Sequence, residues 1–168
     1  MKTNMRWIKL MKNDIVDGED VCVSLWVSGC NIRCPHCHNK STWDFDQGAF
    51  FDQDLLIEID QAISKNGIQR NFSVLGGEPL CKQNRHDVAI IVKHVREKFP
   101  TIKIFCWTGH VYENLVAEND DDLNVIFNNI DILIDGPYID SQRDITLKLR
   151  GSTNQRILYN NGKGEFHE

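Results

Sequence analysis

The 168-residue sequence contains no apolar run that approaches the ~20 residues needed to cross a bilayer. Residues 1–13 also lack the apolar block of a secretory signal peptide. A basic excess is missing too, because 19 lysines and arginines face 24 aspartates and glutamates, for a formal net charge of −5. These absences argue against a membrane protein and against a nucleic-acid binder. They predict a cytoplasmic protein whose partners are proteins or small molecules.

No internal repeat, low-complexity tract or interdomain linker interrupts the chain. Its 41% hydrophobic and 26% charged residues form an ordinary globular composition, and a chain of this length can bury a core without disulfides. We therefore expect a single domain over residues 1–168, with a flexible tail from about residue 160. In a reducing cytosol, the six cysteines are expected to bind metal, carry redox chemistry or lie buried as thiols.

Three cysteines, Cys30, Cys34 and Cys37, fall within eight residues in a C-x3-C-x2-C pattern. So short a loop can bring three thiolates to one inorganic centre. Structural zinc sites and electron-transfer clusters normally take four protein ligands, so three favour a 4Fe-4S cluster with one iron open to a small molecule. The alternative is a zinc site completed by His36, His38 or a distant cysteine. The other cysteines stand singly on or beside predicted strands: Cys22, Cys81 and Cys106.

Hydrophobic patterning predicts strands that alternate with helices. The apolar run at 21–27 suits a strand buried on both faces, and a turn at Asp17-Gly18 joins it to an earlier strand near 6–10. Further strands are expected at 72–75, 102–107, 130–134 and 156–159. Helices are expected after the capping residue Asp52 as far as Asn66-Gly67, over the apolar positions from Val88 to Phe99, and over 111–128.

This order predicts parallel pairing with right-handed crossovers. Because the units are too few for a closed eight-stranded barrel, the predicted fold class is α/β, an open, incomplete (β/α) barrel with a mainly parallel sheet. Sites in such folds lie at the C-terminal ends of the strands. The cysteine loop follows one buried strand there, and three polar segments follow the others: Gly76-Gly77-Glu78-Pro79, Trp107-Thr108-Gly109 and Asp135-Gly136-Pro137-Tyr138.

Each polar segment has a functional and an ordinary interpretation. Gly76 and Gly77 would let the backbone approach a ligand, and Glu78 or a carbonyl would accept a hydrogen bond from a protonated amine. Asp135 is suited to a hydroxyl or an ammonium group, and Thr108 would face the same edge. The alternative for each segment is a strand-ending turn with no ligand.

The cysteine spacing resembles that of radical S-adenosylmethionine (SAM) enzymes. The flanking segments, Ser28-Gly29-Cys30 and Cys37-His38-Asn39-Lys40-Ser41-Thr42-Trp43, resemble those of the proteins that activate anaerobic ribonucleoside-triphosphate reductase. The resemblance covers about residues 14–156 and includes the Arg150-Gly151-Ser152-x-Asn154-Gln155 stretch. One departure is visible, because the glycine-rich, proline-containing turn usual before the first strand reads Asp17-Gly18-Glu19-Asp20 here.

The resemblance implies an incomplete barrel of the radical SAM type and a defined activity. Three irons of a 4Fe-4S cluster would be bound by the cysteines, and SAM would chelate the fourth, with the segment 76–78 gripping its amino group. An electron from a flavodoxin-type donor would cleave SAM to methionine and a 5′-deoxyadenosyl radical, which takes hydrogen from a glycine of the reductase large subunit. The implied contacts to the cofactors are His36, Gly76, Gly77, Glu78, Thr108, Asp135, Arg150 and Asn154.

The sequence leaves two alternatives open. In the first, the chain activates another glycyl-radical enzyme, such as one of the formate-lyase type. In the second, it is a zinc-binding module without catalysis. The segment 39–43 and the lack of room for a second ferredoxin-like cluster favour the reductase as substrate.

Overall fold

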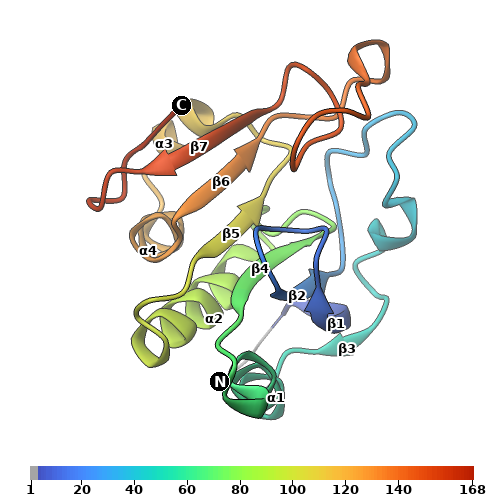
Figure 1. The fold of residues 1–168 in the computed structure, drawn as a ribbon. Helices are drawn as coiled ribbons and strands as arrows, with labels where there is room; N and C mark the ends of the chain where they lie inside the picture. The colour runs from blue at the N-terminus through green and yellow to red at the C-terminus, as the bar shows by residue number, and fades with distance from the viewer. Residues whose placement is uncertain (1–3) are drawn as a thin grey trace.

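The computed structural model describes residues 4–168, which form a mixed sheet with helices packed on one face (Figure 1). The strands are β1 (Arg6–Asp14), β2 (Cys22–Val27), β3 (Ala49–Phe50), β4 (Asn71–Gly76), β5 (Ile104–Trp107), β6 (Ile132–Asp135), β7 (Arg156–Asn160) and β8 (Phe166–His167). The helices are α1 (Gln53–Ile63), α2 (Arg85–Lys98), α3 (Tyr112–Ala117) and α4 (Asp121–Asn129), with 3-10 turns η1 (Lys40–Thr42), η2 (Lys65–Gly67) and η3 (Asp140–Gln142).

The sheet has the order β3-β1-β2-β4-β5-β6-β7-β8 and stays open. Its centre, β2-β4-β5-β6, is parallel, whereas β1, β3, β7 and β8 pair antiparallel. The α/β class and the open sheet are therefore confirmed, but a mainly parallel sheet describes only the centre. The loop between β1 and β2 is too short for the crossover that parallel pairing requires, so this pair forms a hairpin.

Local signals account for the helix starts. Asp52 caps α1, because its Oδ1 accepts the N–H of Leu55 at 3.0 Å, as predicted. The helical region expected over 111–128 forms two helices, α3 and α4, instead of one. The helix is interrupted at Asn119, whose φ is +49°. Asp120 then caps α4 by accepting the N–H of Leu123 at 3.0 Å. The acidic run that follows lies in the first turn of α4, where the helix dipole favours negative charge.

The two faces of the sheet are covered differently. On one face, Val23, Leu25 and Val27 of β2 join the main core with α1, α2 and α4, as the helices beside the sheet in Figure 1 indicate. The alternate side chains of the central strands point to the opposite face. A smaller apolar cluster lies there around Phe105 and Trp107. Loops cover this second face in the part of the chain that the structure describes, and they leave room for a site.

The β1–β2 loop folds over this second face near the N-terminal ends of the central strands. Asp14 holds it by accepting the N–H groups of Val16 and Asp17 at 2.8 and 3.1 Å. Ser73 of β4 donates its hydroxyl to the Asp17 carbonyl at 2.6 Å. The loop closes that end of the sheet, so the remaining opening lies at the C-terminal strand ends.

The predicted flexible tail is wrong for the residues after 160. Strand β8 pairs with β7, and Phe166 is 8% exposed. Its ring packs edge-on against Tyr112 and Phe127, with centroid distances of 5.5 and 5.7 Å. Burial of one aromatic ring anchors the chain end to α3 and α4. Within residues 4–168, no helix combines the length and apolar character of a membrane span.

Candidate cluster and cofactor site

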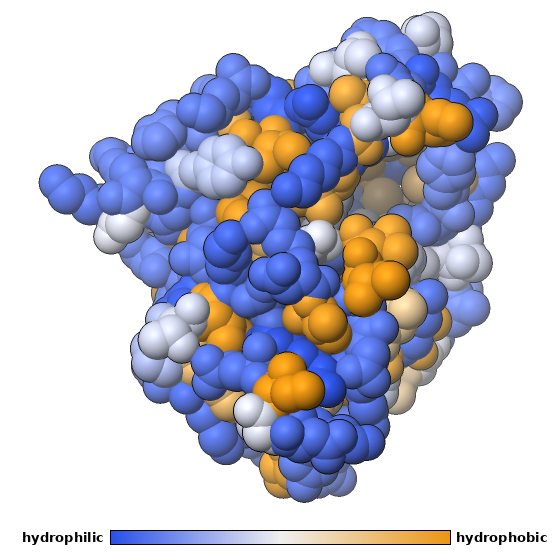
Figure 2. Space-filling model, in the orientation of Figure 1, coloured by the Kyte–Doolittle hydropathy of each residue, from blue (hydrophilic) through white to orange (hydrophobic). Residues whose placement is uncertain are grey.

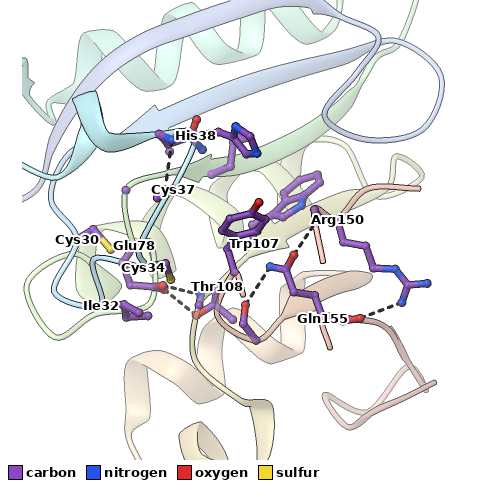
Figure 3. Close-up of a pocket in the computed structure, with 18 of the residues that line it drawn as sticks. Cys30, Ile32, Cys34, Cys37, His38, Glu78, Trp107, Thr108, Arg150 and Gln155 are labelled. Atoms are coloured by element: carbon purple, nitrogen blue, oxygen red, sulfur yellow. Dashed lines mark hydrogen bonds between the residues drawn. The ribbon is translucent and has the colours of Figure 1, made fainter. Parts of the chain in front are cut away.

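A cavity of about 480 Å³ lies at the C-terminal ends of β2, β4 and β5, and all three cysteines of the C-x3-C-x2-C loop line it. Figure 3 shows Cys30 and Cys34 beside Glu78 on one side of the cavity, with Trp107, Arg150 and Gln155 across from them. Figure 2 shows the molecule hollowed in its upper right part, with hydrophobic side chains beside the hollow. The predicted convergence of the strand-end segments is therefore confirmed for all four: the cysteine loop, Gly76–Glu78, Trp107–Gly109 and, through Gly136 and Tyr138, the segment after β6.

The cysteine loop is held at both ends by backbone hydrogen bonds. The N–H groups of Gly29 and Cys30 donate to the carbonyls of Thr42 and Trp43, at 2.7 and 3.1 Å. Gly29 has φ +92°, and a Cβ there would lie 2.0 Å from the ring of Phe45. Only glycine therefore fits where the strand turns into the loop. The loop returns on itself and presents its sulfurs to the cavity.

Backbone N–H groups surround the cysteine sulfurs. Burial raises the pKa of the Cys30 thiol, and the N–H groups of Arg33 and Ile32 oppose this shift. Burial likewise raises the pKa of the Cys34 thiol, and the hydrogen bond from the N–H of Tyr138 opposes this shift. The N–H of Asn39 donates to Cys37 Sγ at 3.4 Å. N–H groups directed at thiolates are what iron–sulfur clusters use to stabilise and tune their sulfur ligands, so this donor set fits a cluster.

A single-ion site is not formed by these residues. Within residues 4–168, no three His, Cys, Asp or Glu side chains are arranged to hold one metal ion. His36, one of the candidate fourth ligands, is exposed and does not line the cavity. His38, the other candidate, does line the cavity, and the three thiols lie along a wall with room for a group larger than one ion.

The Gly76-Gly77-Glu78 turn packs directly against the start of the cysteine loop. Gly77 donates its N–H to the Val27 carbonyl at 2.9 Å, and Glu78 donates its N–H to the Gly29 carbonyl at 2.7 Å. Gly76 has φ +107°, which favours glycine. The turn therefore sets the position of the first cysteine as well as part of the cavity wall.

The Glu78 carboxylate joins two strand ends. It is 1% exposed, and it accepts hydrogen bonds from the N–H of Leu80 at 3.0 Å, the Thr108 hydroxyl at 2.7 Å and the N–H of Gly109 at 2.7 Å. Burial raises its pKa, and the charge of His110 and these donors oppose the shift. Both predicted residues, Glu78 and Thr108, line the cavity, but they bind each other. Their side chains build the wall, which the sequence did not indicate.

Asp135, a predicted cofactor contact, lies away from the cavity wall. It is 1% exposed, does not line the cavity, and accepts both Arg156 Nε at 3.0 Å and Arg156 Nη2 at 2.6 Å. It also accepts the N–H of Tyr112 at 2.8 Å. The reason is the antiparallel register of β6 and β7, which places Arg156 opposite Asp135. A strand pairing that was not predicted thus neutralises the carboxylate inside the fold.

Two other predicted cofactor contacts also lie outside the cavity. His36 is exposed, and Asn154 donates its amide to the Pro137 carbonyl at 2.7 Å, so both predictions lack support from the geometry. Arg150 does line the cavity, and it donates Nη1 to the Gln155 carbonyl at 2.9 Å. Five of the predicted contacts therefore reach the cavity wall: Gly76, Gly77, Glu78, Thr108 and Arg150.

Sequence reasoning missed the aromatic and aliphatic part of the wall. Trp107 donates its indole N–H to the Leu149 carbonyl at 2.8 Å and so fixes the long loop after β6 over the sheet. The signal in the sequence was the placement of large aromatic residues at strand ends, beside the polar motifs. The wall residues that no sequence pattern placed there include Trp26, Ile32, Leu147 and Leu149, whereas Tyr138 belongs to the segment 135–138 that was expected to face this edge.

The cavity wall also carries a carboxyl group that binds a proton near neutral pH. Burial, together with the hydrogen bond and charge of Asp14, raises the pKa of Asp17 to about 7, although Lys9 opposes the shift. The pKa of Asp14 is lowered. Burial alone would raise it, but hydrogen bonds from Asp17, Ser24 and backbone N–H groups outweigh that effect. The pair therefore shares one proton over the pH range between their pKa values.

We expect Asp17→Asn to change how stability depends on pH. Because the folded state raises the pKa of Asp17, its protonated form favours folding below about pH 4, and this contribution is lost as the pH rises through about 7. Thermal unfolding of the cluster-loaded protein under anaerobic conditions measures it. Between about pH 4 and about pH 8, the melting temperature of the unmodified protein should fall relative to that of the variant. Parallel curves for both proteins would contradict the raised pKa.

Comparison with known proteins agrees with the geometry of the site. The family described as a 4Fe-4S single cluster domain matches residues 16–158. The anaerobic ribonucleoside-triphosphate reductase-activating protein of Enterobacteria phage T4 is 34% identical over 158 residues, which cover 93% of this chain and 95% of the relative. The proteins of the same name from Salmonella typhi and Escherichia coli K12 are 35% and 36% identical, over 91% and 86% of this chain and 97% and 92% of theirs.

Relatives of this similarity and coverage establish the family. The matched region contains all the segments that line the cavity, from Val16 to Gln155, with the three cysteines in its first part. The chain belongs to the family of anaerobic ribonucleoside-triphosphate reductase-activating proteins.

Proposed function

We propose that this chain is a radical SAM activase that installs a glycyl radical on the large subunit of anaerobic ribonucleoside-triphosphate reductase. The observation that carries the proposal is the lining of one cavity by Cys30, Cys34 and Cys37. Family membership supports the substrate, since the relatives are named for activating this reductase. The open sheet supports an incomplete barrel of the radical SAM type, in a single domain over residues 1–168 that works in the cytoplasm.

The residues at the cavity would have three roles: they would bind the cluster, position SAM and exclude water. Cys30, Cys34 and Cys37 would hold a 4Fe-4S cluster, and the segment 76–78 would position the amino group of SAM. When bound, the cluster and SAM together supply a one-electron cleavage that yields methionine and a 5′-deoxyadenosyl radical able to take hydrogen from a glycine. Trp107 and the loop it fixes would cover the nucleoside and keep water from the reaction.

Anaerobic turnover tests the proposed chemistry. The purified protein, reconstituted with iron and sulfide and reduced with dithionite, should convert SAM to 5′-deoxyadenosine and methionine. Oxidised protein should not do so, because the cleavage consumes an electron. A protein that binds stoichiometric zinc, holds no iron and leaves SAM intact under dithionite would overturn the proposal in favour of a zinc-binding module.

Glu78→Gln is expected to weaken SAM binding through the shape of the cavity. The amide NH2 would replace one acceptor oxygen and would face a donor such as the N–H of Gly109. Leaving these buried donors unsatisfied would destabilise this part of the wall by about 1–3 kcal/mol. The joined ends of β4 and β5 would then separate. Calorimetric titration of the cluster-loaded protein with SAM measures the effect.

The matched control for this variant is Cys81→Ala. Cys81 is 1% exposed and follows the same turn, but its side chain does not line the cavity. SAM affinity should fall clearly in Glu78→Gln and remain near that of the unmodified protein in Cys81→Ala. Equal affinities in both variants would contradict the role assigned to Glu78.

A further inference from the structure

The cysteine loop carries free positive charge on an acidic protein. From Asn31 to Trp43 the sequence has two cations, Arg33 and Lys40, two histidines and no carboxylate, whereas the whole chain has a formal net charge of −5. Arg33 and Lys40 are exposed. This segment, residues 31–43, is called the basic loop below.

The two cations of the basic loop are not neutralised by the fold. No described residue forms an ion pair with Arg33 or Lys40, although Arg85, Arg96 and Arg156 elsewhere in the chain all have carboxylate partners. Asp44 and Asp46 follow the basic loop and likewise form no ion pair among residues 4–168. Within the basic loop itself the unpaired exposed charges are both positive, and such charges create a local potential that attracts an acidic surface.

Both cations gather over one aromatic ring next to the cysteines. The guanidinium carbon of Arg33 lies 5.9 Å, and Nζ of Lys40 lies 6.0 Å, from the centre of the Trp43 ring. Trp43 also lines the cavity with the cysteines. The positive charge is therefore held beside the site that takes up the electron.

The same loop carries exposed residues directly between two of the cysteines. Cys34 and Cys37 are half-buried, and the two residues between them, Pro35 and His36, are exposed. The N–H of Cys37 donates to the Cys34 carbonyl at 3.1 Å, which closes this turn tightly. A redox partner seated here would approach the sulfurs across one turn of backbone, without crossing the core.

We propose that the basic loop is the docking surface for an acidic one-electron flavoprotein of the flavodoxin type, with Arg33 and Lys40 as the contact charges. This inference rests on the proposed function, which needs one external electron per SAM cleaved. The reduced flavin gives up one electron and the cluster gains it, with no group transferred. Electron-transfer complexes are typically small and weak, and complementary charge gives them their association rate.

Charge reversal at Lys40 tests the docking surface. Stopped-flow mixing of the oxidised cluster-loaded protein with reduced flavodoxin follows bleaching of the cluster absorbance, so the measurement does not depend on SAM. Lys40→Glu should slow this reduction about tenfold at low ionic strength and less at high salt. Adding Arg33→Glu should slow it further. Dithionite, a small chemical reductant, should reduce Lys40→Glu at the rate of the unmodified protein.

The matched control is Lys163→Glu, which makes the same change of charge at an exposed position in the β7–β8 turn. Equal slowing in Lys163→Glu, or no slowing in Lys40→Glu, would overturn the docking surface, as would equal slowing with flavodoxin and dithionite. Failure of the proposed function is a separate result, in which the cluster is reduced normally but SAM is not cleaved.

Discussion

The variant Cys34→Ala is expected to lose the iron–sulfur cluster and all cleavage of SAM. On the proposed ligation, three thiolates would already leave one iron without a protein ligand, and the loss of a second position would leave the cluster open to solvent and to disassembly. Iron should fall from roughly four atoms per chain to below one after anaerobic reconstitution. Cys34 is half-buried at the cavity wall, so alanine leaves little void and the fold should persist.

The control for this loss is Cys106→Ala. Cys106 is a fully buried thiol of β5 that packs in the main core, and burial raises its pKa well above the ordinary value. Its variant should keep its iron and cleave SAM. Retention of iron by Cys34→Ala, or loss of iron from both variants to the same extent, would contradict the assignment of the ligands.

The second large effect is expected from Gly77→Ala. A Cβ at Gly77 would lie 2.3 Å from the Gly29 carbonyl oxygen, and backbone on both sides has to move to admit it. Overpacking of this kind costs about 1–3 kcal/mol. The movement also strains the 2.7 Å hydrogen bond from the Glu78 N–H to Gly29, which precedes the first cysteine. We therefore expect Gly77→Ala to lower the free energy of unfolding and to lose iron on gel filtration.

Gly67→Ala separates a local effect from general destabilisation. Gly67 has φ +70°, and a Cβ there would meet nothing within 4 Å, so its variant costs about 1 kcal/mol of backbone strain far from the cysteines. Denaturant unfolding and iron analysis of both variants give the comparison. At similar stability, only Gly77→Ala should lose iron, and equal iron content would contradict the coupling between the turn and the cysteine loop.

Patterns that depend on local sequence predicted most of the fold. Apolar runs gave the central strands, Asp52 gave the start of α1, and a turn at Asp17-Gly18 joins β1 to β2. The edges of the sheet were harder, because β7 and β8 acquire their direction from tertiary pairing. Phe166 illustrates this point: nothing near it in the sequence shows that Tyr112 and Phe127 will bury its ring.

The candidate site was predictable where the spacing of a motif constrains its residues to one short loop. Cysteines spaced three and two residues apart after a buried strand must share one loop, and the structure puts them at one cavity. Polar residues were less predictable, because each has several possible partners. Asp135 pairs with Arg156 across β6 and β7, and Glu78 binds Thr108, so neither carboxylate is free in the way its position suggested.

One measurement tests the account most directly. The reduced, cluster-loaded protein is mixed with SAM and the large subunit of anaerobic ribonucleoside-triphosphate reductase, and electron paramagnetic resonance is recorded after SAM cleavage. The expected result is a glycyl radical on the reductase that requires SAM and is absent with Cys34→Ala. A radical that forms on a formate lyase but not on the reductase, or SAM cleavage that leaves both proteins without a radical, would contradict it.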